Sequence, residues 1–140
     1  MSAFRKATFA DVVPITRLLR NLYKKVGACY TIPFDFNSTL VTVDDVVRRG
    51  ICQVGPNSCA GAIIGAFPFN FNFQLAYVSF WAFETPREIR IFKALADACK
   101  AEGATHIWAA SHHPRHMIAR YYEALGLTPV ETYSITALHG

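Results

Sequence analysis

The stretch from Leu75 to Phe83 constrains the fold of this chain more than any other part of it. Its side chains are apolar at almost every position, and Ser79 is the polar exception within it. A strand that is apolar on both faces belongs inside a sheet that is covered on both sides by helices. The sequence therefore predicts an α/β fold in which residues 75–83 form a central strand.

The residues after this strand predict a helix and then a second, parallel strand. Between Pro86 and about Glu102, apolar residues recur at helical spacing and Gly103 follows as a C-terminal cap. The run His106 to Ala110 is again rich in apolar residues. Strand, helix and strand together predict a right-handed crossover, which places the end of the first strand over the N-terminus of the helix.

Upstream of the central strand, the pattern predicts antiparallel strands. Ile51 to Val54 and Cys59 to Phe67 are β-rich and flank the turn sequence Gly55-Pro56-Asn57, so they form a hairpin. Phenylalanines then alternate with Pro and Asn from Phe67 to Phe73, which indicates a strand with one aromatic face. Such a face usually belongs to the core; an exposed one would instead indicate a surface for a partner.

The N-terminal part is expected to contain a strand, Phe4 to Ala7, and an amphipathic helix. Thr8 or Asp11 would cap this helix, and Asp11 is favoured because Pro14 then falls in the tolerant first turn. Residues 27–39 are expected to form a loop that borders a substrate cleft. A short helix is expected to follow this loop. Thr42 and Asp45 have the spacing of a capping box, which predicts that the helix begins there.

The C-terminal part is expected to contain a helix from about Arg115 to Leu125, closed by Gly126. The stretch Val130 to Leu138 is rich in β-formers and predicts a final strand.

Composition excludes several classes of protein. A chain of 140 residues with 52% hydrophobic residues predicts one folded domain over residues 1–140 rather than a disordered chain. Asn70, Asn72 and Gln74 interrupt the most apolar region, so no membrane span is expected, and the N-terminus is unlike a secretory signal. We therefore expect a cytoplasmic protein. The net charge of +4 favours anionic partners in general, but no nucleic-acid motif accompanies it.

Three segments resemble one known family. Residues 5–15 look like its opening strand and helix, and Trp81 to Gly103 looks like its cofactor-binding segment. Tyr122-Glu123-Ala124-Leu125-Gly126-Leu127 is similar to its near-terminal Tyr-Glu-Lys-Leu-Gly-Phe element, which is the most specific match. With the order of elements, these matches make the chain resemble the GNAT-type N-acetyltransferase superfamily. The resemblance implies a mixed, mostly antiparallel sheet of about six or seven strands flanked by about four helices.

The resemblance also implies a reaction and its site. The protein would transfer an acetyl group from acetyl-CoA to an amine of a small molecule or protein, by direct attack in a ternary complex. The backbone of Trp81, Ala82 and Phe83 would pair with the pantetheine arm of the cofactor. Tyr122 would protonate the leaving thiolate, because a phenol and a thiol have similar proton affinities. Tyr121 is the neighbouring alternative.

The expected pyrophosphate site departs from the family pattern. It falls at a helix N-terminus, whose amides favour anions. The glycines expected there are replaced throughout, and Glu88 and Phe92 would crowd or repel a pyrophosphate, whereas Lys93 and the arginines would supply charge. Its residues are Arg87, Glu88, Ile89, Arg90, Ile91 and Phe92, and Arg115 joins them as a cofactor-binding residue. An alternative therefore remains: a catalytically weak or inactive module of the same fold that acts by binding a protein partner. The partner of the chain could also be a second copy of itself, in a homodimer.

The remaining polar residues give weaker predictions. Glu84, at the end of the central strand, is the first candidate for the general base, with His112 and His113 as alternatives. His112 and His116 are four residues apart, but no Cys or carboxylate completes a tetrahedral set, so no metal is expected. Cys29 and Cys99 lack a base partner, so all four cysteines are interpreted as buried free thiols.

Overall fold

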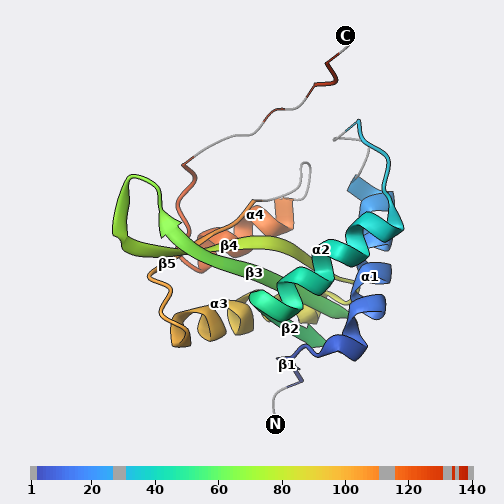
Figure 1. Ribbon diagram of the computed structural model, residues 1–140, viewed down its shortest axis with the longest axis horizontal. Helices are drawn as coiled ribbons and strands as arrows, with labels where there is room; N and C mark the ends of the chain where they lie inside the picture. Colours follow the sequence, from blue (N-terminus) through green and yellow to red (C-terminus); the bar gives the residue numbers. More distant parts are fainter. Residues whose placement is uncertain (1–2, 27–30, 111–115, 131–133, 135, 139–140) are drawn as a thin grey trace.

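The computed structural model describes residues 3–26, 31–110, 116–130, 134 and 136–138. They form an α/β fold whose single sheet has five strands in the order β1-β2-β3-β4-β5. Helices cover both faces of this sheet (Figure 1). The predicted fold class is therefore confirmed, but the expected six or seven strands are not found among the described residues.

The strand bounds explain the lower count. The strands are β1 (Arg5–Lys6), β2 (Ile51–Gly55), β3 (Ser58–Phe67), β4 (Asn70–Phe83) and β5 (His106–Trp108). The aromatic run and the central strand, expected as two strands, are one long strand, β4, because only a two-residue turn separates Phe67 from Asn70. The described residues of the 130–138 stretch form no strand, and residues 131–133 and 135 lie outside the described part.

The strand directions agree with the sequence pattern. β1 to β4 pair in antiparallel fashion, and the hairpin around Gly55 to Ser58 is confirmed. β5 runs parallel to β4, as the crossover predicts. β4 therefore lies inside the sheet, between β3 and β5, with the helix α3 (Ile91–Ala101) leading from one parallel strand to the other.

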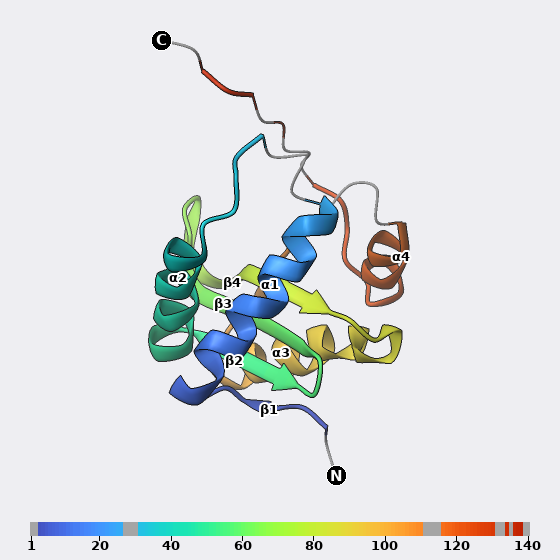
Figure 2. The same cartoon turned by 90° about the vertical axis from the view of Figure 1, so that its right-hand side faces the viewer.

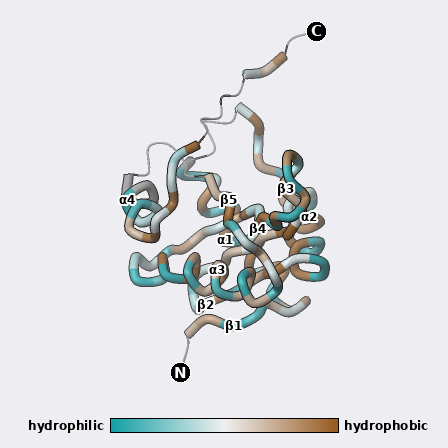
Figure 3. Tube along the Cα trace, turned by 90° about the vertical axis from the view of Figure 1, so that its left-hand side faces the viewer, coloured by the Kyte–Doolittle hydropathy of each residue, from teal (hydrophilic) through white to brown (hydrophobic). Residues whose placement is uncertain are grey.

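Two pairs of helices cover the two faces of the sheet (Figure 2). α1 (Val12–Val26) and α2 (Phe36–Arg49) pack over one face, around Ile15, Val43 and Phe80. α3 (Ile91–Ala101) and α4 (His116–Ala124) pack over the other, around Trp81 and Phe92. The helices alternate between hydrophilic and hydrophobic positions along the trace, as expected when one face of each is buried (Figure 3). No helix of the described residues is both long enough and apolar enough to span a bilayer.

The first helix begins where the sequence predicts, because α1 starts at Val12, directly after Asp11, but the capping residue differs. Thr8, not Asp11, begins the first helical turn, because the Asp11 carboxylate accepts the Thr8 N–H at 2.8 Å and also pairs with Arg5. A short 3-10 turn (Phe9–Asp11) results, and Pro14 still lies in the first turn of α1. The Arg5 guanidinium lowers the pKa of Asp11 to about 2.

The second helix begins earlier than the sequence predicted. Asp35 caps α2, because its carboxylate accepts the Ser38 N–H at 2.8 Å, so the helix starts at Phe36 rather than near Thr42. Thr42 lies inside the helix, where its hydroxyl donates to the Ser38 carbonyl. Residues 36–39 of the expected loop therefore belong to α2, and residues 27–30 lie outside the described part of the chain.

Candidate functional site

The two parallel strands separate halfway along β4. They pair at Leu75 with His106, at Ala76 with Ile107 and at Tyr77 with Trp108. β5 ends there, whereas β4 continues to Phe83, and the described residues show no further pairing between the two strands. The backbone groups of Val78 to Ala82 that face β5 are therefore open to an extended ligand on that edge.

A β-bulge lies at the start of this open half. Gly61 pairs with Phe80 and Ala62 with Val78, so Ser79 is an extra residue on β4. Bulges change the direction of a strand and re-aim its side chains, often beside active sites. Ser79 is exposed, while the next three residues of β4 are buried.

An aromatic cluster covers the open half of β4 on the α3 side. The Trp81 ring stacks on Tyr122, with centroids 5.6 Å apart, and contacts Phe92 at 4.9 Å. The Tyr121 ring also contacts Trp81 and Phe92. The Trp81 indole N–H is buried and has no hydrogen-bond acceptor among the described residues. A buried donor of this kind is a candidate to meet a ligand or a water.

Tyr122 lies where the two parallel strands separate. Its hydroxyl donates to the Ala110 carbonyl at 2.6 Å, two residues beyond the end of β5, while its ring stacks on β4. The side chain is 9% exposed. Burial raises the pKa of the neighbouring Tyr121, and the charges of Arg90 and Lys93 act against that rise, so α4 lies close to the positive start of α3.

The expected pyrophosphate segment adopts a conformation that the sequence did not predict. Pro86–Arg90 forms a 3-10 helix before α3. Its Glu88 N–H donates to the Thr85 carbonyl, and the Ile91 N–H donates to the carbonyls of Glu88 and Ile89. These two amides are therefore engaged within the backbone, so an anion at this segment would have to be bound by other amides or by side chains.

Side chains in this segment divide into buried and exposed groups. Glu88, Ile91 and Phe92 are buried and Ile89 is half-buried. Arg87, Arg90 and Lys93 are exposed. Because Glu88 and Phe92 point into the protein, neither crowds the outer surface where the cations lie. The expected crowding by these two residues is therefore wrong, for a packing reason that the sequence does not contain.

Glu88 connects the 3-10 helix Pro86–Arg90 to the β2–β3 turn. Its Oε1 accepts the Asn57 N–H at 2.9 Å and the Ser58 hydroxyl at 2.7 Å, and its side chain is buried with Ser58. A second link runs from the Glu84 N–H to the Asn57 carbonyl, at 3.0 Å. This connection was missed by sequence reasoning, because nothing local in the sequence relates Glu88 to residues thirty positions away.

Glu84 faces the other side of β4 from Tyr122. Its carboxylate accepts a hydrogen bond from the Asn21 side chain of α1 at 3.0 Å, and it is exposed. Tyr122 instead packs with Trp81 and Phe92 on the α3 side. The two predicted catalytic groups thus approach the end of β4 from opposite faces.

Other predicted residues are less informative. His112, His113, Arg115 and Cys29 lie outside the described residues. Cys52, Cys59 and Cys99 are free and buried, as expected, and burial raises the pKa of Cys99 to about 11 and that of Cys52 to about 12. Such thiols are poor nucleophiles. Within the described ranges, no group of three or more His, Cys, Asp or Glu side chains is arranged to hold a metal.

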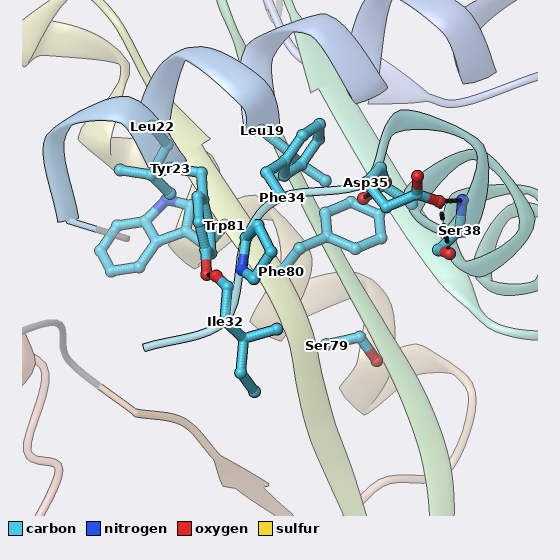
Figure 4. A pocket seen from close by; sticks show the side chains of 12 residues that line it. Leu19, Leu22, Tyr23, Ile32, Phe34, Asp35, Ser38, Ser79, Phe80 and Trp81 are labelled. Carbon is cyan, nitrogen blue, oxygen red and sulfur yellow. Dashed lines mark hydrogen bonds between the residues drawn. The ribbon is translucent and has the colours of Figure 1, made fainter. Parts of the chain in front are cut away.

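A cavity of about 510 Å³ opens on the Glu84 side of β4 (Figure 4). α1 contributes Leu19, Leu22 and Tyr23, and the bulged part of β4 contributes Ser79, Phe80 and Trp81. The segment before α2 contributes Ile32, Pro33, Phe34 and Asp35, and the start of α2 contributes Ser38 and Thr39. The Tyr23 hydroxyl donates to the Ile32 carbonyl, which ties this segment to α1. A cavity of this size accommodates a small molecule.

Solved structures share this fold over nearly the full chain. A predicted acetyltransferase from Clostridium acetobutylicum, solved with acetyl-CoA, matches 96% of this chain and 94% of its own, with 12% identity and a TM-score of 0.75. A Trypanosoma brucei acetyltransferase matches 96% and 98%, with 17% identity and a TM-score of 0.66. A ribosomal-protein-alanine N-acetyltransferase from Brucella melitensis matches 98% and 100%, with 13% identity and a TM-score of 0.65.

Sequence comparison adds no relative to these. No protein-family model and no curated protein matches the chain. At identities below one fifth, the structural matches define the fold: it is that of the GNAT-type acetyltransferases. The expectation taken from the sequence resemblance is confirmed at that level.

Proposed function

We propose that the protein is an acetyl-CoA-dependent N-acetyltransferase that transfers the acetyl group directly to an amine in a ternary complex. The observation that carries this proposal is the open edge of β4 after Tyr77, which lies beside Tyr122 and is followed by the exposed Arg87 and Arg90. An extended thioester cofactor needs a strand edge for its amide groups and positive charge for its phosphates. Both lie on one continuous part of this fold.

The proposed reaction assigns a task to each predicted group. The lone pair of a neutral amine forms a bond to the acetyl carbon, the carbon–sulfur bond breaks, and the departing thiolate takes a proton. Tyr122 supplies that proton when its O–H turns from the Ala110 carbonyl toward sulfur. Glu84 accepts the proton that the amine loses, directly or through a water. Their positions on opposite faces of β4 suit a reaction that brings two substrates together across the strand.

The cofactor part of the proposal can be tested without knowing the acceptor. Acetyl-CoA binds the folded state, so the melting temperature of the purified protein should rise with its concentration. Arg90→Glu should reduce this shift strongly, because it reverses a charge at the expected phosphate site. Lys100→Glu, a matched charge reversal on an exposed residue near the other end of α3, should leave the shift intact. The absence of any shift for the wild type at millimolar acetyl-CoA would refute the proposed function.

A second candidate function is supported by a different region. Phe69, Phe71 and Phe73 are 88%, 75% and 42% exposed at the tip of the β3–β4 hairpin. Clustered exposed aromatics are typical of surfaces that bind a protein partner. If acetyl-CoA produces no thermal shift, this hairpin becomes the preferred functional surface, and the fold would serve as a binding module. A shift that Arg90→Glu removes favours the enzyme.

A further inference from the structure

The cavity beside β4 has a chemistry that selects among acceptor amines. Most of its wall is apolar: Leu19 and Leu22 come from α1, Phe34 from the segment before α2, and Phe80 from β4. Figure 4 shows the side chains of Leu19, Phe34 and Phe80 close to one another. Apolar walls of this kind gain free energy by covering an apolar ligand body.

Charge in the cavity wall is sparse. Among the described lining residues, Asp35 is the single charged one. Its Oδ2 accepts both the N–H and the hydroxyl of Ser38, which lowers the pKa of the carboxyl and keeps it ionised at neutral pH. Oδ1 takes part in neither bond. One carboxylate matches one ammonium group, whereas a second ammonium on the same ligand would meet apolar wall without a partner, which is costly.

One further polar residue of the cavity wall lies at the β4 bulge. Ser79 lies there as the unpaired bulge residue, directly before the buried Phe80 and Trp81. The proposed acetyl transfer would take place along the same part of β4. An acceptor with its apolar body against Leu19, Phe34 and Phe80 would therefore lie beside this part of β4.

We infer that the acceptor is a small monoamine with an apolar body about the size of an aromatic ring, bound in this cavity, rather than a polyamine. This inference rests on the proposed function and specifies its second substrate. The volume, the apolar wall and the single carboxylate all point to the same class of ligand.

Binding of the amine can be measured apart from catalysis. Trp81 lines the cavity, and Trp108→Phe leaves it as the only tryptophan, so its fluorescence reports occupancy. With acetyl-CoA absent or present, 2-phenylethylamine should bind at least about tenfold more tightly than 1,4-diaminobutane, since even one missing methylene in an apolar pocket costs about tenfold or more. Equal affinities, or tighter binding of the diamine, would overturn the inference.

Two variants locate the binding. Phe34→Gln should weaken 2-phenylethylamine about tenfold, while Phe71→Gln, on the exposed hairpin outside the cavity, should change nothing. Asp35→Asn keeps a good helix cap but removes the charge, so it should weaken 2-phenylethylamine by about threefold and leave the uncharged 2-phenylethanol unaffected. Circular dichroism checks that each variant folds, and the comparison of amines on the wild type stands without them.

The outcomes separate this inference from the proposed function. A thermal shift with acetyl-CoA together with no preference for 2-phenylethylamine would leave the enzyme proposal intact and refute the acceptor class. Preferential binding of 2-phenylethylamine without any effect of acetyl-CoA would refute the proposed function and identify the cavity as a binding site of another kind. Acetylation of 2-phenylethylamine, measured as release of the CoA thiol, would support both the proposed function and the acceptor class.

Discussion

The two ends of β4 use similar residues and reach opposite environments. At its start, Phe71 and Phe73 alternate with asparagine and are exposed. At its end, Phe80 and Trp81 are buried, and together with Ala82 they separate the two layers of helices. The strand is continuous, so the contrast comes from what covers it rather than from its own conformation.

Coverage differs because the helices do not reach the hairpin tip. α1 and α2 pack over one face of the C-terminal half of the strand and α3 over the other, while the β3–β4 turn projects beyond them (Figure 1). A register shift between Ala66 and Phe67 also leaves residues 71–73 outside regular pairing with β3. The covered end carries the candidate site, and the uncovered end carries the alternative surface for a partner.

Truncation at the covered end should have the largest effect. Phe80→Ala removes a ring that is 9% exposed and lies over Gly61, where even a single added carbon would meet the ring at 2.5 Å. We expect the free energy of unfolding to fall by about 3–5 kcal/mol, toward the lower value because the ring also borders the cavity. Urea denaturation measures it. Phe80→Leu should cost clearly less, and a loss below about 1 kcal/mol for Phe80→Ala would contradict the contrast between the ends.

Tyr122→Phe tests the covered end as a site rather than as core. It keeps the ring that stacks on Trp81 and removes the hydroxyl, so packing is retained. If Tyr122 is the proton donor, kcat should fall about a hundredfold, equivalent to about 2.7 kcal/mol in the barrier, while the KM for acetyl-CoA stays nearly unchanged. Steady-state kinetics gives both values. Equal losses in affinity and turnover would assign the hydroxyl a structural task through its bond to Ala110.

Glu88→Ala tests whether the hydrogen bonds of Glu88 to the β2–β3 turn fix the segment that follows β4. The variant leaves the Asn57 N–H and the buried Ser58 hydroxyl without their acceptor, so the free energy of unfolding should fall by about 1–3 kcal/mol. Glu88→Gln retains an oxygen at that position and should lose less. Thermal and urea unfolding compare the two. A wild-type stability in Glu88→Ala would show that this hydrogen-bonded link does not fix the loop.

The sequence predicted the covered end better than the uncovered one. Continuous apolar residues identified β4, its parallel neighbour β5 and the helix between them, because these features are local in the chain. Phe69 to Phe73 have a pattern that fits a core strand equally well, and nothing in their sequence tells how far the helices extend. The start of the second helix failed for a related reason: Asp35 caps α2 in place of the Thr42 and Asp45 spacing, and only the surrounding chain selects between such arrangements.

The candidate site divides in the same way. Tyr122 and the cationic side chains of Arg87 and Arg90 could be selected from local motifs and charge. The hydrogen bonds of Glu88 to the β2–β3 turn and the cavity lined by Phe34 depend on residues from distant segments. No spacing in the sequence predicts them. Both features follow from the tertiary packing of the chain.

Phe71→Ala should have the smallest effect, although it is the same substitution as Phe80→Ala on the same strand. The side chain is 75% exposed, so truncation removes little buried surface, and the free energy of unfolding should change by less than about 0.5 kcal/mol. Urea denaturation beside Phe80→Ala gives the ratio of the two losses. A large loss for Phe71→Ala in the isolated protein would mean that the hairpin is covered in solution, for instance by a second copy of the chain, and its concentration dependence would identify that case.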